Sequence, residues 1–203
     1  MKEDMKMESN VGMLPDGSVM CGPACYCRLE GYELYIHGHG EIDVLYDFKG
    51  GYLTRSQEWQ CRQDHRPWQK CAAYLKKIVI DEGITRIDRM AFRGFHSLEE
   101  VVIPSTVKTI GAGAFMNCDL LKTVVLPEGV EAIEAYAFAN CYWMKSFYAP
   151  ESLRNIGQYA FNGCVSLRTL EISPFADLEG LGVLAGRIKI KEGATKSLWD
   201  VVY

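Results

Sequence analysis

Long apolar runs are missing from this 203-residue sequence. No run of about 18 apolar residues occurs, which excludes a membrane-spanning helix from the pattern. The first residues, Met1–Asn10, are charged and lack the apolar segment of a signal peptide. Asn-x-Ser/Thr acceptor sites for glycosylation are also missing. As written, the sequence predicts neither a membrane span nor a signal peptide, and it leaves the compartment open.

Clustered positive charge is also lacking. The 22 Lys and Arg residues are scattered, and with 26 Asp and Glu they give a formal net charge of −4. This distribution argues against nucleic acid or an anionic membrane as the partner. The composition, 48% hydrophobic and 24% charged, is that of a folded domain.

Recognised catalytic and nucleotide-binding motifs do not occur: there is no Walker A motif, H-E-x-x-H, G-x-S-x-G or EF-hand loop. Gly38-His39-Gly40 lacks the third glycine and the following helix of a dinucleotide site, and we interpret it as a tight turn. We therefore expect a protein that is not an enzyme and holds no cofactor.

A 23-residue repeat is what the sequence does contain. Apolar residues recur at this spacing in parallel columns. One column consists of Leu75, Leu98, Leu121, Met144 and Leu167, and the next of Ile78, Val101, Val124, Phe147 and Leu170. An Ala-Phe pair recurs at Ala91-Phe92, Ala114-Phe115, Ala137-Phe138 and Ala160-Phe161. A fixed period with apolar columns means that each unit buries its apolar side against its neighbours.

The unit predicts an α/β repeat solenoid. Val101 and Ile103 alternate with polar neighbours, as in a short strand that ends at Pro104. The Ala-Phe-x-x-Cys segment predicts one helical turn on the opposite side. We therefore expect 23-residue units with parallel strands on one face, short helical turns opposite, and a cap at each end.

The pattern L-x-x-V-x-I-P-x-x-V-x-x-I-G-x-x-A-F-x-x-C, clearest at Leu98–Cys118, resembles the leucine-rich repeats of the BspA-like (Treponema pallidum type) family. Asp88 and Glu134 depart from it at the glycine position, and Phe95 stands in place of a cysteine. The resemblance implies a leucine-rich-repeat fold and a surface or secreted bacterial protein that adheres to host or matrix proteins.

Four segments follow from the register. We expect a flexible arm over residues 1–20, an N-terminal cap over 21–74, four full repeats and a partial fifth over 75–172, and a C-terminal cap over 173–203. Leu45–Lys70, with Trp59 and Trp68, suits a loop that covers the first repeat.

Eight cysteines are more than an ordinary domain carries. Cys118, Cys141 and Cys164 follow the repeat, and we expect thiols packed in the core, with a disulfide between neighbouring repeats as the alternative. Five others lie in or beside the N-terminal cap, near His37, His39 and His65: Cys21, Cys25, Cys27, Cys61 and Cys71. Their spacing suits zinc poorly, so buried thiols or cap disulfides are expected, and a metal-dependent or Cys-based activity is the alternative.

The outward positions of the strands form the candidate binding surface, here called the strand face. One column is Lys77, Glu100, Thr123, Ser146 and Thr169, and the other is Val79, Val102, Val125, Tyr148 and Glu171. Repeat proteins commonly bind through such extended faces, although β-branched residues also suit exposed strands for their own sake.

We therefore expect a non-enzymatic module that binds proteins. The resemblance favours the cell surface or secretion, whereas an intracellular scaffold is the alternative if Met1 is the native start.

Overall fold

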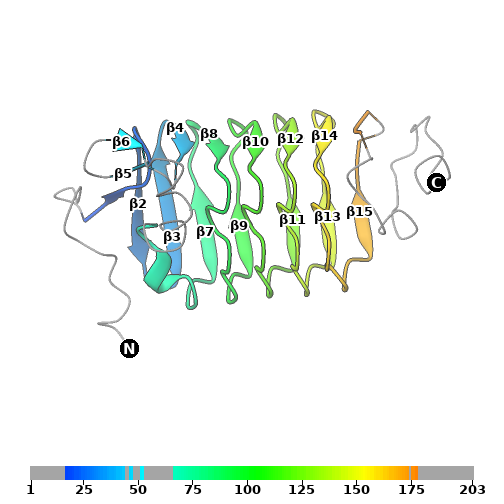
Figure 1. Ribbon diagram of the computed structural model, residues 1–203, viewed down its shortest axis with the longest axis horizontal. Coiled ribbons are helices and arrows are strands. Elements are labelled where there is room, and N and C mark those ends of the chain that lie inside the picture. The colour runs from blue at the N-terminus through cyan, green and yellow to red at the C-terminus, as the bar shows by residue number, and fades with distance from the viewer. Residues whose placement is uncertain (1–16, 44–45, 48–50, 53–65, 174, 178–203) are drawn as a thin grey trace.

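Short strands dominate the fold and lie side by side along its long axis (Figure 1). The computed structural model describes residues 17–43, 46–47, 51–52, 66–173 and 175–177. Within them the only helix is the 3-10 turn η1 at Gln69–Cys71. The expected parallel strands are confirmed.

The first row of strands carries the strand face. It consists of β7 (Lys77–Ile80), β9 (Glu100–Val102), β11 (Thr123–Val125), β13 (Ser146–Tyr148) and β15 (Thr169–Glu171). Ile78 pairs with Val101, and Val124 pairs with Phe147, in parallel and 23 positions apart. This register stacks equivalent residues of neighbouring repeats, so the apolar columns of the sequence become continuous rows of the core.

A second row of parallel strands was not expected from the sequence. It contains β4 (Gly40–Ile42), β8 (Ile84–Ile87), β10 (Thr109–Ile110), β12 (Ala132–Ile133) and β14 (Asn155–Ile156). Each repeat therefore contributes two short strands. The inward residues of this row, such as Ile87, Ile110 and Ile133, are almost completely buried.

The expectation of short helical turns at the Ala-Phe segments is wrong. The N–H of Phe92 donates to the carbonyl of Ala114 in the next repeat (2.8 Å), whereas the N–H of Ala114 donates within its own repeat to Gly111 (3.1 Å). Alternate amides thus bond between repeats, which a helix does not allow. Met90, Tyr136 and Tyr159 also adopt left-handed backbone angles, with φ of 57–59°, and these interrupt a right-handed helix.

Aromatic side chains form the centre of the core. Phe92, Phe115, Phe138 and Phe161 stack in sequence with ring centroids 5.3–5.7 Å apart, and all are buried. Trp68 continues the stack over Phe92 at 5.3 Å. Trp68 therefore covers the first repeat, as expected for this part of the cap, whereas Trp59 lies outside the described residues.

The cap also supplies hydrogen-bond donors to the open end of the repeats. The buried Arg66 donates from Nη1 to the carbonyls of Ala91 (2.9 Å) and Arg93 (3.1 Å), and Trp68 donates from Nε1 to Ala91 (3.0 Å). In later repeats the equivalent carbonyls accept backbone N–H groups from the preceding repeat. Side chains thus replace the donors that the first repeat lacks. The sequence analysis did not identify Arg66, whose pKa falls to about 10 because of burial.

The N-terminal cap is an antiparallel extension of the first row. It contains β1 (Val19–Met20), β2 (Cys25–Glu30) and β3 (Glu33–Gly38), and β3 pairs in parallel with β7. A small hairpin joins β5 (Tyr46–Asp47) to β6 (Gly51–Tyr52). Val19 is buried, so residues 19–20 belong to the cap rather than to the expected arm. Residues 1–16 and most of the expected C-terminal cap lie outside the described residues.

Acidic residues and glycines alternate at one position of successive repeats: Asp88, Gly111, Glu134 and Gly157. A Cβ on Gly111 would lie 2.6 Å from the Arg89 nitrogen and 2.7 Å from the Asp88 carbonyl carbon, so only glycine fits. Arg86 of the first repeat reaches Glu134 of the third at 2.7 Å. The ion pair therefore spans the intervening repeat, where Gly111 has no side chain.

Candidate functional site

The strand face points outward over its whole length. All ten predicted residues, Lys77, Val79, Glu100, Val102, Thr123, Val125, Ser146, Tyr148, Thr169 and Glu171, are at least partly exposed, whereas the strand residues between them are buried. Figure 1 shows the strands that carry them as one row. The structure therefore brings the predicted residues together on a single surface.

Uncharged side chains occupy the middle of this surface. Val102 and Val125 are 41% and 62% exposed, which is high for aliphatic residues within strands. Hydroxyl groups of Thr123, Ser146 and Tyr148 lie beside them on β11 and β13. The arrangement offers apolar area with neutral hydrogen-bonding groups, as found in the centre of protein interfaces.

Charged side chains lie at the two ends of the strand face. At the N-terminal end Lys77 pairs with Glu100 at 3.0 Å, and this hydrogen bond raises the pKa of the Lys77 ammonium group. Glu171 lies at the other end, on β15. The charges thus frame the uncharged middle rather than interrupting it.

The cap lengthens the same surface, which the sequence analysis did not identify. Tyr35 pairs with Val79 in register, and Arg28 pairs with Tyr35, so outward residues of β3 and β2 continue the strand face. The Tyr35 hydroxyl donates to Glu33 Oε2 at 2.6 Å. The alternation of polar and apolar residues at Tyr32–Ile36 predicted this strand but not its partner.

A break in the hydrogen bonding crosses the middle of the strand face. β7 pairs with β9, and β11 pairs with β13, but β9 and β11 form no ladder. At the equivalent positions on either side, Glu100 N–H donates to Lys76 and Ser146 N–H donates to Lys122. Among the described residues no such bond joins Lys122 or Thr123 to Glu99. The ion pair between Lys122 and Glu99 (2.9 Å) spans the break instead.

The cap cysteines form a buried group of thiols. Cys21, Cys25, Cys27 and Cys71 are at most 1% exposed, and the Sγ atoms of Cys21 and Cys25 lie 3.2 Å apart. Burial raises the pKa of Cys21 and Cys71, which disfavours the thiolate that a nucleophile or a zinc ligand requires. No group of three metal-ligating side chains with suitable geometry exists among the residues that the structure describes. Cys61 and His65 lie outside them.

The repeat cysteines are buried free thiols, as expected. Each directs its Sγ to the carbonyl of the Phe in the preceding repeat, at 3.3 Å for Cys118, 3.3 Å for Cys141 and 3.1 Å for Cys164. The alternative of a disulfide between repeats is not seen at these three positions. The thiol thus fills space and also satisfies a buried acceptor, a second role that the spacing did not reveal.

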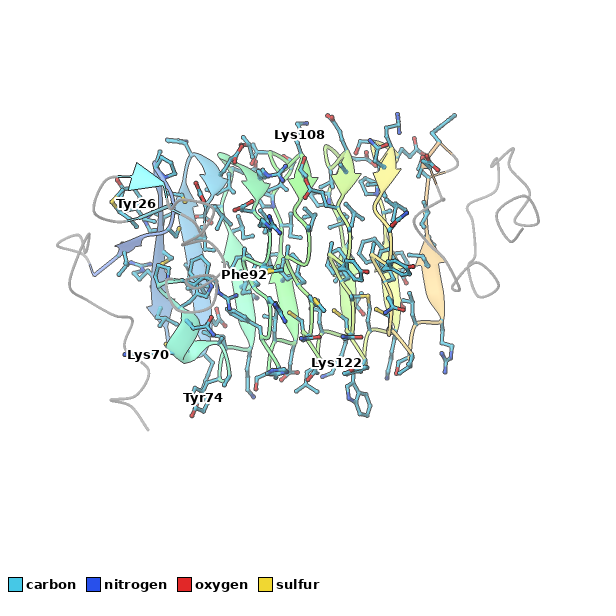
Figure 2. The ribbon with its side chains drawn as sticks, in the orientation of Figure 1. Tyr26, Lys70, Tyr74, Phe92, Lys108 and Lys122 are labelled. Atoms are coloured by element: carbon cyan, nitrogen blue, oxygen red, sulfur yellow. The ribbon has the colours of Figure 1, made fainter. Side chains whose placement is uncertain are left out.

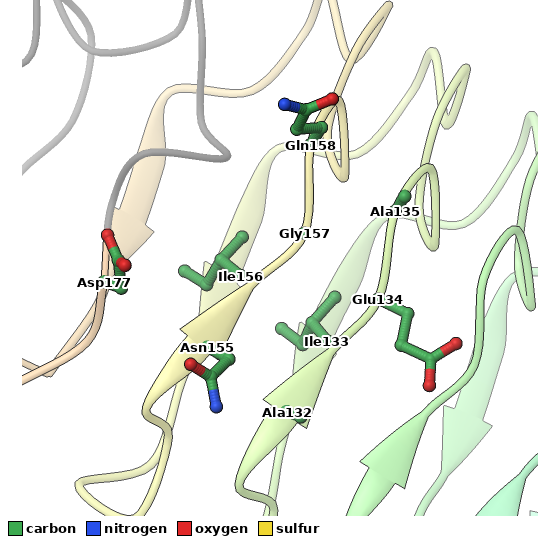
Figure 3. A pocket seen from close by; sticks show the side chains of 9 residues that line it. All are labelled: Ala132, Ile133, Glu134, Ala135, Asn155, Ile156, Gly157, Gln158 and Asp177. Carbon is green, nitrogen blue, oxygen red and sulfur yellow. The ribbon is translucent and has the colours of Figure 1, made fainter.

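A shallow groove of about 400 Å³ lies at the C-terminal end of the second row (Figure 3). Its wall is formed by β12, β14 and Asp177, which bridges to Asn155. Glu134, at its edge, is already paired with Arg86. The sequence analysis did not identify this groove, and its lining contains neither a thiol nor a histidine.

The chain matches the model of the BspA type leucine rich repeat region over residues 68–179, in six copies. A search of the curated proteins finds no match. Within the described residues no helix is long and apolar enough to cross a membrane.

Solved bacterial structures share the fold. A leucine-rich repeat protein from Eubacterium ventriosum is similar with 21% identity and a TM-score of 0.66, over 86% of this chain and 44% of that one. The T. pallidum leucine rich repeat protein is similar with 22% identity and a TM-score of 0.50, over 85% of this chain and 60% of that one. A leucine rich cell surface protein from Faecalibacterium prausnitzii is 21% identical, with a TM-score of 0.36, over 80% of this chain and 55% of that one. The chain thus spans about half the length of these proteins.

Proposed function

The chain belongs to the BspA type leucine rich repeat family, and we propose from this that it is a non-enzymatic module that binds a partner protein through the strand face. Modules of this kind generally act by protein interaction. The observation that carries the proposal is the uncharged middle of the strand face, where Val102 and Val125 expose aliphatic area on rigid strands. A flat, preformed surface costs little ordering entropy on binding.

We further infer that the repeats form an open solenoid of 23-residue units, with residues 21–74 and 173–203 as its caps. The register supports this organisation, because strand partners such as Phe147 and Leu170 lie 23 positions apart. In such an array every unit adds its own outward residues to one extended surface.

The proposed setting is the surface of a bacterial cell or the medium around it, with a host or matrix protein as the partner. The family resemblance supports this setting, and an intracellular scaffold is the alternative. Antibody labelling of intact cells tests it: labelling without permeabilisation supports the surface, whereas labelling only after permeabilisation supports the scaffold.

The strand face is tested by pull-down with the wild type and a Val102→Glu/Val125→Glu double variant. Two charges in the uncharged middle should remove the specific partners. Val165→Glu is the matched control, because Val165 is 61% exposed but lies outside the strand face. If the double variant captures the same partners as the wild type, the strand face is not the site.

A further inference from the structure

A second exposed surface lies where each repeat turns back toward its first strand. Hydrophobic side chains gather there on consecutive loops: Tyr74, Leu120, Tyr142, Trp143 and Val165, each 37–61% exposed. Tyr74, Leu120 and Trp143 occupy the same position of their repeats. Figure 2 shows Tyr74 and Lys122 at the same lower edge of the molecule, opposite Lys108. We call this surface the loop edge.

Cations follow the hydrophobic residues along the loop edge. Lys76, Lys122, Lys145 and Arg168 share one repeat position, and Glu99 holds the remaining one. Glu99 lies 3.8 Å from Lys76 and 2.9 Å from Lys122, so its charge is compensated. The positions therefore carry an excess of positive charge on a chain whose formal net charge is −4.

Two of these cations have no counter-charge. Neither Lys145 nor Arg168 has a carboxylate within 4.0 Å among the described residues. The Arg168 guanidinium instead donates to the carbonyls of Val165 (3.1 Å) and Leu167 (3.2 Å). The nearby carboxylate of Asp119 is occupied by His96 at 2.7 Å. Uncompensated positive charge thus lies beside the exposed ring of Trp143.

We propose that the loop edge around Trp143, Lys145 and Arg168 binds an acidic polysaccharide. The C–H groups of a sugar ring carry partial positive charge and pack against the negative face of an aromatic ring such as Trp143 or Tyr142. Carboxylate or sulfate groups of the chain accept charge-assisted hydrogen bonds from Lys145 and Arg168.

The spacing of the cations favours a polysaccharide over a peptide. Equivalent residues of neighbouring repeats lie one strand apart, about 4.8 Å. An extended peptide presents side chains on one side only about every 6.8 Å, twice its rise per residue. A pyranose ring spans about one strand spacing, so a uronic acid polymer presents one carboxylate to each repeat.

The same features disfavour the other polyanions. Nucleic acid binding rests on many phosphate contacts, and only two cations here lack a counter-charge. An anionic bilayer attracts clustered basic residues, whereas the loop edge also carries Glu99 and Asp119 on a chain that is acidic overall.

The test is calorimetric titration of the full chain with polygalacturonate, with neutral dextran, single-stranded DNA and phosphatidylserine vesicles as the competing ligands. Binding to polygalacturonate that weakens with salt is expected. A Lys145→Gln/Arg168→Gln variant and a Trp143→Ala variant should each lower the affinity about tenfold or more, the loss of one good polar or aromatic contact.

Two control variants share the chemistry but not the place. Lys108→Gln removes a cation at the opposite edge, and Tyr159→Ala removes an aromatic ring that is 51% exposed outside the loop edge. Both should bind polygalacturonate like the wild type, as should the Val102→Glu/Val125→Glu variant, and circular dichroism should show all of them folded.

Four outcomes would overturn the proposal: no binding of polygalacturonate, equal binding of dextran, stronger binding of DNA or vesicles, or equal effects of the loop-edge and control variants. None of these results would bear on the strand face, because its test uses a protein partner and different substitutions.

Discussion

The carboxyl group of Asp88 is largely buried beside the second row of strands. Burial raises its pKa from 3.8 to about 6, with Asp43 and Glu41 acting in the same direction, and the Arg89 amide and the Arg86 guanidinium opposing them. Because the folded pKa lies above the unfolded one, the folded state binds this proton more tightly. The stabilisation is complete below about pH 4 and is lost as the pH rises through about 6.

We predict that Asp88→Asn equals the wild type in stability near pH 4 and exceeds it at pH 8, by about 2 kcal/mol after allowance for partial exposure. Urea unfolding at both pH values measures the difference. Asp81→Asn is the control, because Asp81 is exposed at the end of β7. The same difference at pH 4 and pH 8 would contradict the prediction.

Every described cysteine is buried, and the reactivity of the thiols follows from this. Burial raises the pKa of Cys71 and Cys118, and the hydrogen bond with Cys164 raises that of Cys141. Reaction with a disulfide reagent needs the thiolate and access to it.

We therefore expect the seven described thiols to be inert in a reduced Cys61→Ser variant at pH 8 and to react together on unfolding. Titration with Ellman's reagent, with and without denaturant, counts them. A thiol that reacts rapidly in the native protein would show that the cap or the repeats open locally.

At the scale of strands, the break between β9 and β11 is the weakest backbone connection of the strand face. Amides that donate across a ladder exchange slowly with solvent, whereas those without an acceptor do not wait for unfolding. We predict that the amide hydrogens of Lys122 and Thr123 exchange at least about tenfold faster than those of Lys145 and Ser146, whose bonds to Lys122 are intact.

Hydrogen exchange read by NMR compares these four amides in one sample. The equivalent pair Arg168 and Thr169, which both donate to Lys145, serves as a second reference and should exchange slowly. Equal protection of all three pairs would mean that β9 and β11 are joined in solution.

The sequence predicts the first row of strands well because burial imposes a column of apolar residues, from Ile78 to Leu170, that survives every substitution within it. It does not predict the second row, since Thr109–Ile110 and Ala132–Ile133 are too short to show alternation. The break at β9 and β11 leaves no trace either: Glu100–Val102 and Thr123–Val125 have the same pattern as their paired neighbours. Backbone pairing there depends on the relative position of two repeats, which no local pattern records.

The same limit applies to the candidate site. Outward positions such as Val102 and Val125 follow directly from alternation with buried ones. The donors of Arg66 and the continuation through Tyr35 depend on contacts between segments distant in sequence, so they required the structure. The left-handed angles of Tyr136 and Tyr159 were equally hidden, because glycine, at Gly113, occupies that position only once.

The whole molecule combines an acidic chain with two exposed surfaces of different chemistry. The strand face is uncharged in its middle, and the loop edge carries uncompensated cations. The two surfaces lie on different sides of the same rigid repeats, so one partner on each can be held without a change in shape.

The alternation of acid and glycine restricts how such a molecule can change its length, because growth has to proceed in even steps. Duplicating two repeats, Leu98–Trp143, preserves the order of acid and glycine. Duplicating Leu121–Trp143 alone sets two copies of Glu134 side by side, with like charges opposed and a Cβ where the repeat after an acid tolerates only glycine. We predict that the longer insertion keeps the parent melting temperature or raises it, and that the shorter one lowers it. Thermal unfolding followed by circular dichroism decides, and equal melting temperatures for the two insertions would show that the single repeat is the true unit of growth.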